Sequence, residues 1–329
     1  MNKNMKTRII ICLGALAAVA STNNFITNAF ERPTAKVTAK IVDEAGVPVI
    51  GANVRFVFSG AMDDNAIVNV EGLTDIQGQF TGEGHCRGDF GASVSKEGFY
   101  FSGLNVSKFT NAIDGKWQPW NPICKTILRP IGKPVALYAK KVDVEIPALD
   151  KPCGYDLEAG DWVAPYGKGM KADFIFTLHQ ERRGLQDFDV LGELTFRNSL
   201  DGLKDAPQPV ATYSHFKWER QAPENDYQPR FQLQNSWHSS GKPIRSFKFN
   251  DREWEGYFFR VRTVEQDGKI VSARYGKIRG GIEIYSRDPN PKVVFTYYFN
   301  PIPNDRNLEW DTKHNLFGGL SDMETPREP

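Results

Sequence analysis

Apolar residues recur at every second position through much of the chain after residue 36. Residues 37–41 alternate Val, Ala and Ile with polar neighbours, and residues 54–58 place Val, Phe and Phe at alternate positions. A period of two puts the apolar side chains on one face of a β-strand. No segment after residue 20 keeps a period of 3.6 residues, and glycine (29) and proline (20) are frequent. The pattern therefore predicts an all-β protein whose strands are joined by tight turns.

Turn residues between the first strands form three spaced motifs. Asp43–Ala52 reads D-E-A-G-V-P-V-I-G-A, Thr74–Phe80 reads T-D-I-Q-G-Q-F, and Lys96–Phe99 ends a strand with K-E-G-F. In the second motif Asp75 can bond to its own backbone ahead, and Gly78 can adopt a positive φ. In this order the motifs resemble the carboxypeptidase regulatory-like domain.

That resemblance implies a transthyretin-like β-sandwich of seven strands, which we assign to residues 34–140. Its last strand is expected over Ile127–Tyr138, after the long segment Phe109–Thr126. Modules of this family accompany exported peptidases, transporters and adhesins as folding or interaction units, and they carry no catalytic residues. The HxxE and HExxH patterns of a zinc peptidase domain are absent from the sequence.

A second β domain is expected over residues 154–299, after a linker over residues 141–153 that contains Pro147 and Pro152. Alternating segments recur there, and the Asp267-Gly268 turn joins two of them as a hairpin. These features predict a second antiparallel β-sandwich or an open barrel. Residues 300–329 are polar and rich in proline, so we expect them to form a tail that wraps the surface.

The first twenty residues have the features of a secretory signal. Three basic residues precede twelve small or apolar ones (Ile9–Ala20), which end in Ala-Val-Ala, a form that signal peptidases cut after. As a helix, twelve residues span about 18 Å, which is too short for the ~30 Å core of a bilayer. We therefore expect a signal of bacterial form over residues 1–20, a short leader over residues 21–33, and an exported protein that is periplasmic or secreted.

The charge balance of the chain limits the classes of partner that it could bind. Without the signal, 38 Lys and Arg stand against 40 Asp and Glu, and no basic block occurs, so neither nucleic acid nor stable membrane insertion is expected.

The mature chain keeps Cys86, Cys124 and Cys153, which suits one disulfide and one free thiol. Cys86 with Cys124 would close a loop in the first domain, and Cys124 with Cys153 would tie the junction. The spacing does not choose between these pairs.

Catalytic patterns are missing. The five histidines lie more than ten residues apart, no GxSxG occurs, and the glycine-rich segment Gly160–Gly169 lacks the spacing of a phosphate loop. Asp187, Asp189 and Glu193 share one strand face, and residues two apart on a strand, such as Asp187 and Asp189, lie about 6.5 Å apart, which a glycosidase pair would permit. An alternating strand nevertheless needs a polar outer face. We therefore assign no catalytic residue, no metal ligand and no cofactor.

The tryptophans are the residues whose positions suggest a binding function. The chain has seven, and Trp117, Trp120 and Trp162 lie in polar, loop-like contexts, where exposed indoles could stack on sugar rings. The main prediction is an exported, non-enzymatic interaction or structural protein whose partner is a protein or a glycan. One alternative is a carbohydrate-binding protein that uses these three tryptophans. The other is a hydrolase whose site assembles from distant residues of the second domain.

Overall fold

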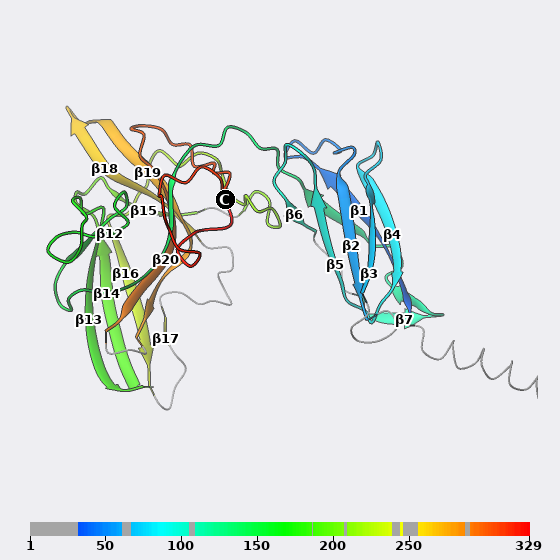
Figure 1. The fold of residues 1–329 in the computed structure, drawn as a ribbon, viewed down its shortest axis with the longest axis horizontal. Coiled ribbons are helices and arrows are strands. Elements are labelled where there is room, and N and C mark those ends of the chain that lie inside the picture. Colours follow the sequence, from blue (N-terminus) through cyan, green and yellow to red (C-terminus); the bar gives the residue numbers. More distant parts are fainter. Residues whose placement is uncertain are drawn as a thin grey trace, which may run out of the picture. The chain divides into compact units, whose positions relative to one another are not determined.

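The computed structural model describes residues 32–60, 67–104, 109–185, 187–206, 209–238, 244–245, 256–286 and 290–329. Within these ranges every regular element is a β-strand, so the all-β prediction is confirmed (Figure 1). No helix there has the length and apolar character needed to cross a membrane. The expected signal and all but the end of the leader lie outside these ranges. The chain forms two compact units, of which unit 1 ends at Pro130 and unit 2 begins at Ile131.

Unit 1 is built from two sheets that enclose one core, which includes Val37, Phe56 and Leu128. The first sheet has the order β4-β1-β8-β7, and a further strand, β9, pairs in parallel with β1. Its strands are β1 (Thr34–Val42), β4 (Gln79–His85), β7 (Asn111–Ile113), β8 (Lys116–Gln118) and β9 (Ile123–Ile127). The second sheet has the order β3-β2-β5-β6. Its strands are β2 (Asn53–Ser59), β3 (Ile67–Leu73), β5 (Phe90–Ser95) and β6 (Ser102–Gly103).

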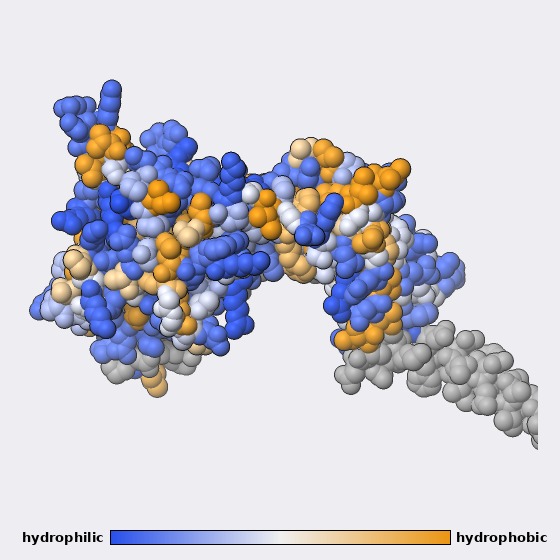
Figure 2. All heavy atoms as spheres, turned by 45° about the horizontal axis from the view of Figure 1, so that its top comes forward, coloured by the Kyte–Doolittle hydropathy of each residue, from blue (hydrophilic) through white to orange (hydrophobic). Residues whose placement is uncertain are grey.

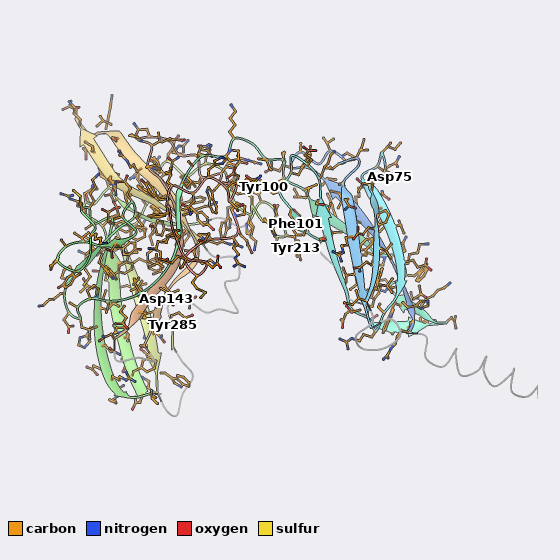
Figure 3. The ribbon with its side chains drawn as sticks, viewed as in Figure 1. Asp75, Tyr100, Phe101, Asp143, Tyr213 and Tyr285 are labelled. Carbon is orange, nitrogen blue, oxygen red and sulfur yellow. The ribbon has the colours of Figure 1, made fainter. Side chains whose placement is uncertain are left out.

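The turn chemistry predicted for unit 1 is present. The Asp75 carboxylate, at the turn that follows β3 (Figure 3), accepts hydrogen bonds from the backbone N–H groups of Gln77 at 2.9 Å and Gln79 at 2.8 Å. Gly78 has a φ of 71°, and a Cβ there would lie 2.4 Å from the carbonyl oxygen of Ile41. Both local predictions for this motif are confirmed. The family resemblance itself stays a prediction.

The end of the first domain was predicted in the wrong place. Strand β9 ends at Ile127, whereas Tyr138 opens β10 (Tyr138–Glu145), which pairs along its whole length with β20 (Lys292–Asn300) of unit 2. The expected strand Ile127–Tyr138 is therefore wrong, and unit 1 ends at Pro130 rather than at residue 140. The linker expected over residues 141–153 is wrong too, because its first five residues belong to β10.

Unit 2 is an antiparallel β-sandwich, the first of the two architectures expected for it. One sheet, which we call sheet E, has the order β10-β20-β19-β18-β15 and adds β15 (Gly202–Asp205), β18 (Gly256–Gln266) and β19 (Lys269–Tyr285). The other, sheet F, has the order β12-β11-β13-β14-β16-β17. Its strands are β11 (Cys153–Asp156), β12 (Asp161–Trp162), β13 (Phe174–Gly184), β14 (Asp187–Thr195), β16 (Arg230–Trp237) and β17 (Ile244–Arg245). Both sheets contribute to one core, in which Phe176 of β13 packs against Phe295 of β20.

The polar C-terminal segment is more than a surface tail. Leu308 and Trp310 are fully buried, and the Trp310 ring lies 5.4 Å from that of Tyr298. Trp310, Tyr298 and Ala139 belong to one small cluster on the side of sheet E that faces away from the main core, and Leu308 belongs to another. Residues of the expected tail therefore complete the packing of unit 2.

Candidate functional site

Trp162 was predicted to be an exposed sugar-binding residue, and this prediction is wrong. Its side chain is 6% exposed, and its ring packs edge-on against Tyr155 at 5.3 Å and Phe176 at 6.0 Å. The polar residues around it led to the loop assignment, but Asp161 and Trp162 form the short strand β12. Trp162 is therefore a core residue of unit 2.

Trp117 and Trp120 belong to unit 1 and have structural contacts. The Trp117 Nε1–H donates a hydrogen bond to the Cys86 carbonyl at 2.9 Å, and its ring packs on that of Phe109. The ammonium groups of Lys36 and Lys116 lie 5.9 Å and 5.1 Å from the centroid of the Trp120 ring. Such cation–π contacts occupy aromatic surface that a sugar platform would need. Both rings are half-buried, so the residues that the structure describes in unit 1 do not present them as an open platform.

The predicted disulfide between Cys86 and Cys124 is wrong. All three described cysteines are buried free thiols. The Cys86 N–H donates to Pro33, just before β1, whereas Cys124 pairs with Ala39. Six residues along a strand correspond to about 20 Å, and a disulfide requires Cα atoms within about 7 Å. Burial raises the pKa of the Cys86 and Cys153 thiols, which disfavours reactive thiolates.

Asp187 and Asp189, two of the three carboxylates on the acidic strand face of β14, are held in ion pairs. Arg183 donates to Asp187 at 3.1 Å and to Asp189 at 2.6 Å, and His238 contacts both carboxylates. The His238 hydrogen bond lowers the pKa of Asp187, and the Arg183 hydrogen bond lowers that of Asp189. A glycosidase acid needs the opposite shift. Among the described residues, no group of three or more His, Cys, Asp or Glu is placed to hold a metal ion.

A pocket that the sequence did not indicate opens at one end of the unit 2 sandwich. It has a volume of about 450 Å³, and we call it the mouth pocket. It lies between the loop before β13, the loop after β14 and the β18–β19 pair. Its charged lining residues are Lys171, Asp173, Arg197, Asp201, Arg262 and Arg274.

A β-bulge forms one wall of the mouth pocket. The register between β18 and β19 shifts between Val261 and Val264, and Arg262 adopts a φ of 56°. A bulge leaves backbone N–H groups without a ladder partner. The Asp201 carboxylate accepts both of them, from Arg262 at 3.1 Å and from Thr263 at 3.0 Å. A non-glycine residue in the left-handed region is strained, and such residues concentrate at functional sites.

The bulge directs the Arg262 guanidinium toward three carboxylates. Its Nε and Nη2 donate to the two oxygens of Asp173, both at 2.8 Å, and it also contacts Asp156 at 3.2 Å and Glu158 at 2.7 Å. Burial lowers the pKa of Arg262, but the bonds to Asp173 and Glu158 outweigh burial and raise it. Arg262 is on sheet E and its partners lie on or beside strands of sheet F. The cluster therefore joins the two sheets at this end.

Asp156 also shapes the loop that carries Lys171. Its carboxylate accepts backbone N–H groups from Glu158, Ala159, Met170 and Lys171, at 2.9 to 3.2 Å. Burial acts to raise the pKa of Asp156, but these four donors outweigh burial and lower it. The loop is thus fixed by backbone bonds, and the Lys171 side chain remains available at the rim of the pocket.

Three cations of the mouth pocket have no anionic partner in the part of the chain that the structure describes. Lys171 and Arg197 are exposed. Arg274 pairs across the ladder with Val261, a core residue, and the Arg274 Nε is buried without an acceptor. Asp173 and Asp201, by contrast, are both engaged by internal donors. The charges of the pocket that lack a partner are therefore positive. The face of unit 2 that Figure 2 shows is mostly hydrophilic.

Comparison with known proteins does not identify the chain. No protein-family model matches it, and no characterised protein matches it at a significant level. One similar solved structure is a protein of Bacteroides uniformis provisionally described as carbohydrate binding. It is 9% identical, the alignment covers 83% of this chain and 99% of that one, and the TM-score is 0.20. A score this low carries no inference about fold or ligand.

Proposed function

We propose that the chain is an exported, non-catalytic binding protein whose mouth pocket holds the acid group of a saccharide such as a uronate. The features of a secretory signal in residues 1–20 support export. A volume of about 450 Å³ falls in the range of small-ligand sites and suits one or two sugar rings. Ser272 and Asn198 line the same pocket as the cations, and such neutral polar side chains suit a ligand with both hydroxyl and carboxylate groups.

The observation that carries this proposal is the unmatched Arg274. Its Nε is buried and has no acceptor among the described residues. Leaving a buried donor unsatisfied costs about 1–3 kcal/mol, and more when the group is charged. Arg274 as a whole is half-buried and lines the pocket, so a ligand oxyanion would pair with the accessible part of its guanidinium, and Lys171 and Arg197 would add to its attraction.

The state of the carboxylates supports binding rather than catalysis. A general acid or base must be free to exchange a proton with the ligand. Asp173 accepts from Arg262 and from the Leu157 N–H through its two oxygens, and Asp201 accepts two bulge N–H groups. Burial raises the pKa of both Asp173 and Asp201 in spite of these donors, which is the shift that a general acid needs, so the case for binding rests on the donors themselves. Neither carboxylate has an oxygen left without a donor.

Unit 1 has a separate proposed role. We assign it to the carboxypeptidase regulatory-like type, as a folding or interaction module without a catalytic site. The paired Asx turns support this assignment, since Asp43 accepts the N–H groups of Ala45 and Val47 as Asp75 does those of its own turn.

Calorimetric titration of the mature chain tests the proposed function. We expect glucuronate or galacturonate to bind and the neutral sugars glucose and galactose not to bind. Arg274→Gln should weaken uronate binding at least tenfold, as expected for a charge-assisted bond worth about 1.5–3 kcal/mol. Arg230→Gln is the matched control, because Arg230 is an exposed arginine of the same unit outside the pocket lining.

Two results would reject the proposal. One is uronate affinity that Arg274→Gln leaves unchanged, since the pocket would then not be the site. The other is acetate binding as tightly as the uronates, since the pocket would then recognise an anion without its sugar.

A further inference from the structure

A second pocket lies on unit 2, on the outer side of sheet E. Lys141, Thr296 and Arg279 are paired across β10, β20 and β19 and so stand in one row. Their neighbours along the strands, Val142, Phe295 and Ile278, belong to the core, so the row faces the other way. The pocket over this row has a volume of about 430 Å³, and we call it the basic pocket.

The basic pocket carries a large excess of positive charge. Four cations line it together with a single carboxylate, that of Glu328. The cations are Lys141, Lys217, Arg279 and Arg327. Neither Lys141 nor Arg327 has an ion-pair partner in the described parts of the chain. The positive charge of the pocket also affects the nearby His215. Burial lowers the pKa of His215 most, and the charges of Arg279 and then Lys217 lower it further. The pocket therefore has the electrostatics of an anion site.

The chain itself places one oxyanion in this pocket. The Glu328 carboxylate forms an ion pair with the Arg279 guanidinium, and the Tyr298 hydroxyl donates to the Glu328 carbonyl at 2.6 Å. The same segment is held at Glu324, whose carbonyl accepts the Lys141 N–H and whose carboxylate pairs with Lys140 at 3.1 Å. Arg279 is thus already engaged in oxyanion recognition. One carboxylate cannot neutralise four cations, so the lining keeps a net positive charge.

We propose that the basic pocket is a second binding site, for the tetrahedral oxyanion of a phosphate or sulfate ester, and that Glu328 is its built-in competitor. A dianionic group fits a multiply cationic pocket better than a monoanionic carboxylate, and it presents more acceptor oxygens. On binding, the ligand takes the place of Glu328 on Arg279 and gains the unpaired ammonium of Lys141. This site is independent of the mouth pocket, since the two have no lining residue in common.

Titration of the full mature chain with inorganic phosphate and, separately, with inorganic sulfate tests the site. Glu328→Gln removes the competitor and should tighten binding up to about fivefold, the size of an exposed ion pair. Lys141→Gln removes a cation and should weaken binding by a similar factor. The anion that binds more tightly identifies the ester class.

Two further measurements keep the test decisive. Bound phosphate or sulfate should raise the pKa of His215 in NMR titrations, because the added negative charge offsets Arg279 and Lys217. Because the mouth pocket is also cationic, the affinity for the basic pocket is taken from the His215 shift, which Arg274→Gln should leave unchanged; this separates the site from the proposed function. The proposal fails if neither anion binds, if Glu328→Gln does not tighten binding, or if Lys141→Gln binds as the parent chain does.

Discussion

Arg129 in unit 1 is buried and Arg274 in unit 2 is half-buried with a buried Nε, and the two differ in what their donors meet. Arg129 is 1% exposed, and its Nε and Nη2 both donate to Glu44 Oε1, at 2.8 Å and 2.7 Å. Arg274 faces the core side of β19, yet its Nε meets no acceptor in the described residues. The other arginine of this pocket, Arg262, forms ion pairs with three carboxylates.

This difference distinguishes an arginine whose charge is paired within the fold from one whose charge is unpaired and can bind a ligand. A matched buried pair costs desolvation but recovers it through its partner, so removing one member is destabilising. An unmatched buried cation has already lost its hydration without compensation, so removing it relieves a cost. The same residue type therefore stabilises unit 1 and is available for binding in unit 2. Mutations at the two kinds of site should act in opposite directions.

The largest effect is expected at Asp173, the bidentate partner of Arg262. Asp173→Ala leaves a mostly buried guanidinium short of its main acceptor and should lower the free energy of unfolding of unit 2 by about 3–5 kcal/mol. Urea unfolding followed by tryptophan fluorescence measures this. Glu158→Gln is the control, because that carboxylate is 31% exposed and should cost below about 1 kcal/mol. A loss of under 1 kcal/mol for Asp173→Ala would mean that the cluster is not structural.

A smaller loss is expected for the matched arginine of unit 1. Glu44→Gln should destabilise unit 1 by about 1–3 kcal/mol, because Arg129 would lose its charged acceptor while Glu44 itself is 26% exposed. Glu71→Gln is the matched control, since the Arg55–Glu71 pair is half exposed on both sides and should contribute below about 1 kcal/mol. Equal effects from the two variants would contradict the distinction between buried and surface pairs.

For the unmatched arginine the sign should reverse. Arg274→Met keeps much of the side-chain volume without the charge, and the ligand-free protein should gain up to about 1 kcal/mol or stay unchanged. Differential scanning calorimetry without added ligand measures this gain. A destabilisation above 2 kcal/mol would show that Arg274 has a structural partner and would remove the basis of the comparison.

Local features of the fold could be predicted from the sequence. Alternation over residues 37–41, 54–58 and 188–196 identified strands, and the Asp and Gly of the second motif specified their turn. Strand β10 was missed because its partner β20 lies about 150 residues away, and no local signal reports such a pairing. Trp162 was misplaced because polar neighbours do not reveal a two-residue strand within a core.

The mouth pocket could not be predicted, for a physical reason that centres on Arg262. In the sequence, Tyr257, Phe259 and Val261 alternate with Arg260 and Arg262, a pattern that by itself places both arginines on the opposite face of a regular strand. A bulge then changes the register after Val261, although the residue with positive φ is an arginine rather than the glycine or asparagine that would announce it. Arg274 could have been noticed in the sequence. It has the same parity as Gly276 and Ile278, so it lies on the face of the strand that points toward the core. An arginine on such a face indicates a buried charge.

The smallest effect is a pair of opposite histidine shifts within unit 2. The Asp150 hydrogen bond raises the pKa of His179 above its ordinary value of 6.5, whereas burial, then Arg279, then Lys217 lower the pKa of His215 below it. His179 therefore contributes stability that is present below about pH 6.5 and is lost as the pH rises through its folded pKa. His215 contributes stability that is present above about pH 6.5 and is lost as the pH falls.

NMR titration of both rings resolves the two shifts. Arg279→Gln should raise the pKa of His215 and leave that of His179 unchanged, and Asp150→Asn should lower only that of His179. Failure of Arg279→Gln to move His215 would leave burial as the sole cause of its shift. The positive charge of the basic pocket on sheet E would then have no measurable effect on a nearby histidine. The basic pocket would in that respect resemble the acidic face of sheet F, where each described aspartate on β14 is already paired with a cation.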